Sequence, residues 1–111
     1  MEQTGAVLCG ANSYTQKYYL DNQFQSLPVQ VKNELQIMCV LYTEEVGGIL
    51  TLSFDHEGNL HFQSVADDMD YYFDEISAGL KIRDMQHSKS ELLSMLEMYY
   101  KVFCNSSAIQ K

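Results

Sequence analysis

Two short stretches of alternating apolar and polar residues, 49–54 and 60–63, flank a glycine-containing turn, and this pattern limits the possible folds more than any other feature. Apolar residues at every second position are typical of a β-strand with one buried face. The sequence therefore predicts an antiparallel β-hairpin over about residues 48–65, whose apolar face the rest of the chain must cover. The residues of this face are Leu50, Leu52, Phe54, Leu60 and Phe62.

The register of the hairpin depends on the length of its turn, within residues 55–59. A two-residue loop would pair Phe54 with His61 and place polar side chains in the buried row. A three-residue loop with Gly58 in the left-handed conformation pairs Phe54 with Leu60 instead. We predict the three-residue loop, because a shift of one residue would move the apolar side chains of the return strand into water.

The stretch after Ser26 predicts an amphipathic helix over about residues 28–45. Ser26 is a suitable N-cap, and Pro28 is tolerated in the first turn because its missing N–H is not needed there. Apolar side chains then recur at intervals of three and four, and Gly47 can end the helix. Residues 39–44 are also β-favouring, so a shorter helix followed by a strand stays open, although we favour the full helix. The apolar stripe comprises Leu27, Val31, Leu35, Met38 and Tyr42.

A C-terminal helical segment is expected over about residues 68–104. Its acidic start suits the positive end of a helix dipole, and two apolar stripes follow. Either one long helix runs from about residue 74 to 104, or Ser88 and Glu91 belong to a capping box that starts a separate last helix. We favour the long helix, because serine is only mildly unfavourable inside one. The first stripe is Phe73, Ile76 and Leu80, and the second is Ile82, Met85, Leu92, Leu96, Tyr99 and Phe103.

A chain of 111 residues, 46% of them hydrophobic, can bury one core but not two. We therefore expect a single α+β domain over residues 1–111, in which the hairpin or a small sheet packs against the helical segments that flank it. Residues 1–26 carry too many large aromatic side chains for a free tail. Whether they form a strand or irregular structure stays open.

The three cysteines match neither a disulfide framework nor the CxxC spacing of a zinc site. We expect reduced thiols, with Cys39 buried in an apolar stretch and Cys104 exposed.

A formal charge of −8 restricts the partners of the chain. Only seven Lys and Arg can neutralise phosphates, which argues against nucleic acids and anionic membranes. No stretch is apolar enough to span a bilayer, and the N-terminus lacks the basic start of a secretory signal. We therefore expect a cytoplasmic protein.

The sequence contains no recognisable motif for catalysis or cofactor binding, and we predict no cofactor and no metal. Residues 55–59 resemble a calcium loop in composition, but glycine stands fourth instead of sixth and no glutamate stands twelfth. His56 and His61 can approach each other across the hairpin, yet no third ligand is near them in the sequence. A turn and surface histidines explain these residues better.

Two features predict a partner-binding surface. Five acids lie within residues 67–75, and such a cluster is either a solvated helix start or a surface that steers a basic partner. The second feature is three pairs of adjacent tyrosines, which either line a small core or leave one member of each pair exposed at an interface. The candidate residues are Asp67, Asp68, Asp70, Tyr71, Tyr72, Asp74, Tyr99 and Tyr100.

Several short motifs support a resemblance to a known family. They are Leu27-Pro28, Lys32–Val40, Gly47–Leu52, Phe54-Asp55, Gly58–Leu60, Asp74–Ile76 and Leu80–Ile82. From about Cys9 to Phe103 the chain resembles a small uncharacterised bacterial family of unknown function from anaerobic gut Firmicutes. The resemblance implies a bacterial cytosolic setting, and it implies neither an activity nor site residues.

Three functional hypotheses follow. The leading one is a non-enzymatic protein-binding or regulatory module that holds a partner or a second copy of itself. The rival is a small enzyme or ligand-binding domain with a pocket between hairpin and helices, which would use Asp70, Asp74 or His61. A weaker alternative is an acidic mimic of nucleic acid that occupies a nucleic-acid-binding protein.

Overall fold

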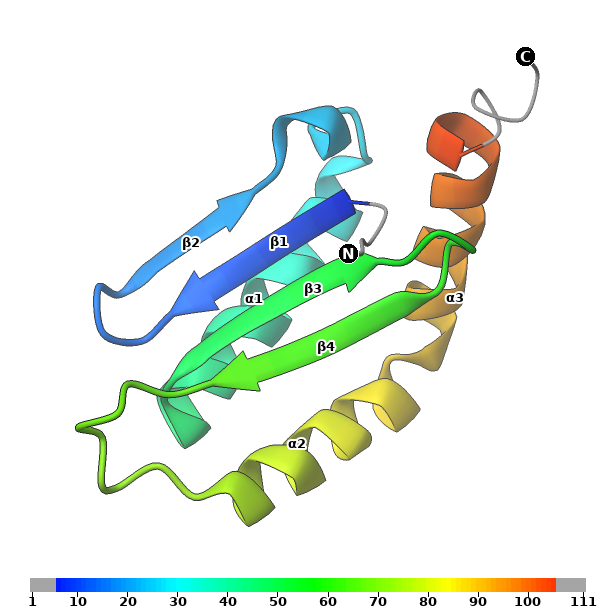
Figure 1. Ribbon diagram of the computed structural model, residues 1–111. Helices are drawn as coiled ribbons and strands as arrows, with labels where there is room; N and C mark the ends of the chain where they lie inside the picture. The colour runs from blue at the N-terminus through cyan, green and yellow to red at the C-terminus, as the bar shows by residue number, and fades with distance from the viewer. Residues whose placement is uncertain (1–5, 106–111) are drawn as a thin grey trace.

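The fold is a four-stranded antiparallel sheet of order β2-β1-β3-β4, with the helices against one of its faces (Figure 1). The computed structural model describes residues 6–105, with side chains as far as Phe103. The strands are β1 (Ala6–Asn12), β2 (Lys17–Leu20), β3 (Ile49–Phe54) and β4 (Leu60–Val65). The helices are α1 (Val29–Val46), α2 (Glu75–Ser88) and α3 (Ser90–Tyr99), with a 3-10 turn at Asn22–Phe24 and a π-helical end at Tyr100–Asn105. The predicted α+β class is confirmed.

The predicted hairpin and its register are both present in β3 and β4. Phe54 pairs with Leu60, and Leu52 pairs with Phe62. Gly58 has φ +88° and donates its N–H to the Asp55 carbonyl at 3.0 Å. The three-residue loop is therefore confirmed, and the alternation places Leu50, Leu52 and Phe54 wholly in the core.

Residues 6–20, whose structure the sequence left open, form two strands of the same sheet. β1 lies between β2 and β3, where its small residues Gly10 and Ala11 allow close packing. A bulge between Val7 and Cys9 interrupts the pairing with β3. Because a bulge breaks the alternation of side chains, both Leu8 and Cys9 are fully buried.

Helix α1 confirms the full-length prediction and excludes the strand proposed for residues 39–44. Gly47, with φ +87°, ends it and donates its N–H to the Thr43 carbonyl at 2.9 Å. The predicted start is wrong in detail. Pro28 occupies the capping position without a side-chain cap, and the Ser26 hydroxyl is hydrogen-bonded to Tyr99 instead.

The single long C-terminal helix is wrong. Lys89, with φ −111° and ψ +24°, separates α2 from α3, and no side chain caps the start of α3, so the capping box is not formed. The break changes the direction of the chain. As a result α2 runs along the β4 edge of the sheet, and α3 lies behind the end of the sheet at which β3 turns into β4 (Figure 1). Residues 68–74 are also not helical, because Asp74 is the N-cap of α2.

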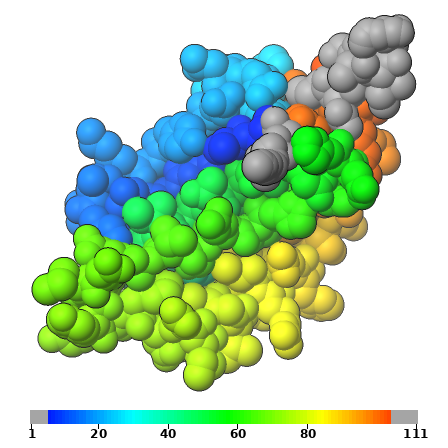
Figure 2. Space-filling view, viewed as in Figure 1, coloured from blue at the N-terminus to red at the C-terminus, as the bar shows by residue number. Residues whose placement is uncertain are grey.

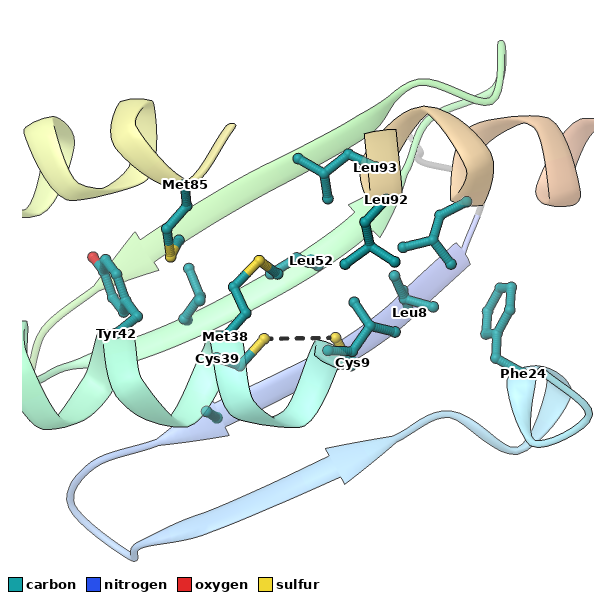
Figure 3. Close-up of a cluster of buried hydrophobic side chains, with 14 of the residues drawn as sticks. Leu8, Cys9, Phe24, Met38, Cys39, Tyr42, Leu52, Met85, Leu92 and Leu93 are labelled. Atoms are coloured by element: carbon teal, nitrogen blue, oxygen red, sulfur yellow. Dashed lines mark hydrogen bonds between the residues drawn. The ribbon is translucent and has the colours of Figure 1, made fainter. Parts of the chain in front are cut away.

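The helices bury one face of the sheet, and the core lies between them (Figure 3). The predicted α1 stripe and most of the second C-terminal stripe face this core, whereas Phe103 is exposed. The first C-terminal stripe is wrong for α2, since Ile76 and Leu80 point outward and Ala78 and Met85 point inward. Cys39 is buried as predicted, and the side chain of Cys104 lies outside the described ones.

Candidate protein-interaction surface

The loop between β4 and α2, residues 66–74, is attached to the turn between β1 and β2. The Tyr14 hydroxyl donates to the Asp70 carboxylate at 2.6 Å and accepts the Asp67 N–H at 3.0 Å. The hydrogen bond to Asp70 raises the pKa of Tyr14 above its usual value. A tyrosine 50 or more residues away in the sequence therefore holds the loop at two points.

A second attachment is the packing of Phe73 against Gly48, at the start of β3. The ring lies so close that a Cβ on Gly48 would be 2.8 Å from Phe73 Cε1 and 2.6 Å from the Val65 carbonyl oxygen. Phe73 is half-buried and packs against the hydrophobic core. The loop is thus held at Asp67, Asp70 and Phe73.

Three of the five acids in this region organise the backbone around them. Asp67 accepts the N–H of Met69 at 3.0 Å, and Asp70 accepts the N–H of Tyr72 at 3.2 Å. Asp74 accepts the N–H of Ile76 and the Ser77 hydroxyl, at 3.0 and 2.8 Å. No Lys or Arg occurs in residues 66–80, so no neighbour in this stretch neutralises the acids.

Large apolar side chains lie beside these acids, in solvent. We call the α2 patch the five residues Met69, Tyr71, Tyr72, Ile76 and Leu80, which are 70%, 79%, 98%, 76% and 60% exposed. They occupy the loop and the first half of α2, which project from the lower side of the molecule in Figure 2. Because large apolar patches on protein surfaces are often interaction sites, these residues form the candidate surface.

The structure separates the predicted candidate residues into two places. Asp67, Asp68, Asp70 and Asp74 lie with Tyr71 and Tyr72 at one end of the sheet, whereas Tyr99 and Tyr100 lie at the other (Figure 1). Tyr100 is 94% buried and stacks on Phe54 with 4.3 Å between ring centres. The Tyr99 hydroxyl is hydrogen-bonded to Ser26 at 2.9 Å. These two tyrosines belong to the core and its margin.

Sequence reasoning missed the apolar part of the α2 patch. The spacing of four residues between Ile76 and Leu80 predicts that both face the core. A competing stripe of Ala78, Ile82 and Met85 has equally good spacing, and this is the one that faces inward. The spacing of this second stripe was the one sign in the sequence that Ile76 and Leu80 could face solvent.

The residues proposed for an enzyme site lie apart from the interior. His61 is on the open face of the sheet and is hydrogen-bonded to Asp55 at 2.7 Å, while Asp70 and Asp74 hold the loop and the helix start. The space between hairpin and helices is filled by side chains such as Leu52 and Met85 (Figure 3).

Two buried thiols lie close together in the core, near a tyrosine hydroxyl. Cys9 Sγ and Cys39 Sγ are 3.8 Å apart and fully buried, and the Tyr18 hydroxyl nearby is buried without a hydrogen-bond partner. The contact with Cys9, together with burial, raises the pKa of the Cys39 thiol, and burial raises that of Tyr18. Cys39 is therefore held as a neutral thiol, which is not the reactive form.

Among the side chains described, those of residues 6–103, no three from His, Cys, Asp or Glu are grouped as metal ligands. The helices described for this chain also include none that is long and apolar enough to cross a membrane.

The fold and the α2 patch define a small α+β protein that presents an ordered acidic and aromatic surface at one end of its sheet. Residues 5–108 match DUF6145, a family of unknown function, and the chain belongs to that family. The expected membership of an uncharacterised family is thereby confirmed. No curated protein and no solved structure matches the chain.

The N-cap of α2 leads to a prediction on pH. Hydrogen bonds from Ser77 and from the N–H of Ile76 lower the pKa of Asp74, so its ionised form stabilises the fold. This contribution is complete above the unfolded-state value of about 4 and is lost as pH falls through the folded-state pKa. We expect Asp74→Ala to lower the free energy of unfolding at pH 7 and to make little difference near pH 2. Urea titrations across this range measure the effect.

Asp68→Ala is the matched control, because Asp68 is exposed and accepts no hydrogen bond within the described residues. It should be close to neutral throughout. An Asp74→Ala deficit that is the same at pH 7 and pH 2 would contradict the assigned role of the carboxylate.

Proposed function

We propose that this protein is a non-enzymatic protein-binding module, and that the α2 patch is the surface that holds its partner. The observation that carries the proposal is the exposure of five large apolar side chains within twelve consecutive residues, two of them tyrosines. Aromatic residues and methionine are enriched at protein interfaces. Burial of these side chains by a partner would supply the hydrophobic part of the binding free energy.

The attachment of the loop supports this role. Tyr14 and Gly48 hold it from two other parts of the chain, so the surface is ordered before a partner arrives. An ordered surface loses less conformational entropy on binding than a flexible one. The acids around it would add steering and select against partners with the same charge.

The setting we propose is the bacterial cytoplasm. It rests on the resemblance to a bacterial family and on the acidic composition with scattered cysteines.

The test is capture from a lysate of the native host on the immobilised full-length chain. We expect a protein that the wild type retains and that Tyr71→Ser/Tyr72→Ser/Ile76→Ser retains at least tenfold less, because hot-spot side chains each contribute on the order of 2 kcal/mol. The matched control is Tyr19→Ser/Ile37→Ser/Leu41→Ser, whose side chains are 53%, 58% and 49% exposed outside the patch. It should bind like the wild type.

Thermal unfolding shows whether both triple variants remain folded. Two results together would overturn the proposal: wild type and patch variant retain the same proteins, and the wild type is monomeric in solution.

A further inference from the structure

The outer side of α2 carries the pattern of a helix crossing. Ile76, Gly79, Leu80 and Arg83 occupy positions i, i+3, i+4 and i+7, the four that surround the contact point of two packed helices. All four are exposed. No element among the described residues 6–105 covers them, since the inward side of α2 is the one with Ala78 and Met85.

The presence of glycine at position 79, on this side of α2, is not explained by the fold. Glycine inside a helix is destabilising relative to alanine. A Cβ at this position would meet no atom within 4 Å, and its φ is not positive. No turn or close approach within the described chain therefore requires glycine here. What the missing side chain does permit is the close approach of another molecule.

One acid and one base on α2 lie at equal distances from Gly79. Glu75 lies four residues before it and Arg83 four residues after it. At 1.5 Å per residue the two are about 12 Å apart along the helix, too far to pair with each other. Arg83 also has no ion-pair partner within residues 6–105. Two copies of the helix can therefore pair this acid with this base when they run antiparallel.

We infer that the occupant of this surface is a second copy of the chain, whose α2 crosses the first one antiparallel at Gly79. The inference rests on the proposed function and names its partner. In an antiparallel pair, a residue four positions after the crossing faces one four positions before it. Arg83 of each copy therefore faces Glu75 of the other. Gly79 faces Gly79 at the crossing, where the absence of side chains lets the helices approach and brings Leu80 of each copy against the other helix.

The negative charge of the two loops favours an antiparallel arrangement, because it keeps the loops apart. Because α2 runs for 14 residues, about 21 Å, antiparallel pairing puts the two loops at opposite ends of the pair. This separation is more than twice the Debye length of about 8 Å at physiological ionic strength. Each loop then lies beside Arg83, His87 and Lys89 of the other copy. A partner that is merely basic would match the loop but not this second half of α2.

The test is sedimentation equilibrium of the full-length chain over a hundredfold range of concentration. We expect a monomer–dimer equilibrium, and we expect Leu80→Ser to raise its dissociation constant at least tenfold. Gly79→Ala is the most informative variant, because it should raise the Tm measured at a concentration where the chain is monomeric and yet weaken the dimer about tenfold. Leu41→Ser, an exposed leucine on α1, is the matched control and should change neither quantity.

The charge pair tests the register. Arg83→Glu and Glu75→Arg should each weaken the dimer severalfold, and the double variant should recover most of the wild-type affinity. A monomer at every concentration overturns the inference, as does a dimer that Leu80→Ser leaves unchanged or a double variant no better than either single one. If the chain is monomeric but the host lysate yields a patch-dependent partner, the proposed function stands and only the second copy is excluded.

Discussion

Gly48→Ala is expected to lower the free energy of unfolding by about 3 kcal/mol or more, and to detach the loop that carries the α2 patch. Gly48 has φ +73°, a conformation that is strained for any residue with a Cβ. The added Cβ would also lie 2.6 Å from the Val65 carbonyl oxygen and 2.8 Å from the Phe73 ring, so strand or ring must move. Urea unfolding measures the loss, and accessibility of the loop to protease measures the detachment.

Gly47→Ala separates these two causes. Gly47 has φ +87°, but a Cβ there would meet no atom within 4 Å. Its ψ of −168° lies in a region that only glycine readily adopts, so the substitution should cost only this backbone strain, about 1–3 kcal/mol, and leave the loop attached. Equal losses at the two glycines would mean that the packing of Phe73 on Gly48 does not hold the loop.

Phe54→Ala is expected to lower the free energy of unfolding by about 3–5 kcal/mol, the range for phenylalanine truncated in a core. Phe54 is fully buried and lies at the end of β3. Its ring stacks on the Tyr100 ring, with 4.3 Å between the ring centres, and its centre lies 5.7 Å from that of the Phe24 ring. Phe54 therefore joins the sheet to the 3-10 turn and to the end of α3. Removing it leaves a cavity that three separate segments would have to close.

Phe103→Ala is the control for the same chemical change. Its side chain is 68% exposed, and its ring centre lies 4.9 Å from that of Tyr99. We expect a loss of less than about 1 kcal/mol, because little apolar area leaves the core. Unfolding curves of both variants and of the wild type measure the two losses in free energy of unfolding. Similar losses at Phe54 and Phe103 would contradict the position of the core described for this fold.

The parts of the fold that follow from neighbouring residues were predictable. The period of two around Gly58 predicted the hairpin, and the cost of placing apolar side chains in water selected its register. The stripe that ends at Tyr42 predicted α1. The strands in residues 6–20 were not predictable to the same degree, because the bulge after Val7 breaks the alternation that identifies a strand.

The candidate surface was predictable only in part. The acids and Tyr71-Tyr72 were found because their grouping is visible in the sequence. Tyr99-Tyr100 has the same local appearance, yet Tyr100 lies against Phe54, a contact between residues 46 positions apart. Nothing local distinguishes the two tyrosine pairs, since what differs is the part of the sheet that each one meets.

By itself the sequence determined the α+β class, the hairpin with its turn and the length of α1, because each depends on spacing within one segment. Only the tertiary structure decided which side of α2 is buried. Ile76 with Leu80 and Ala78 with Met85 are both compatible with a helix, and the choice depends on how α2 lies against α1 and α3. The break at Lys89 sets that position, and it thereby leaves Ile76 and Leu80 in solvent beside the acidic loop.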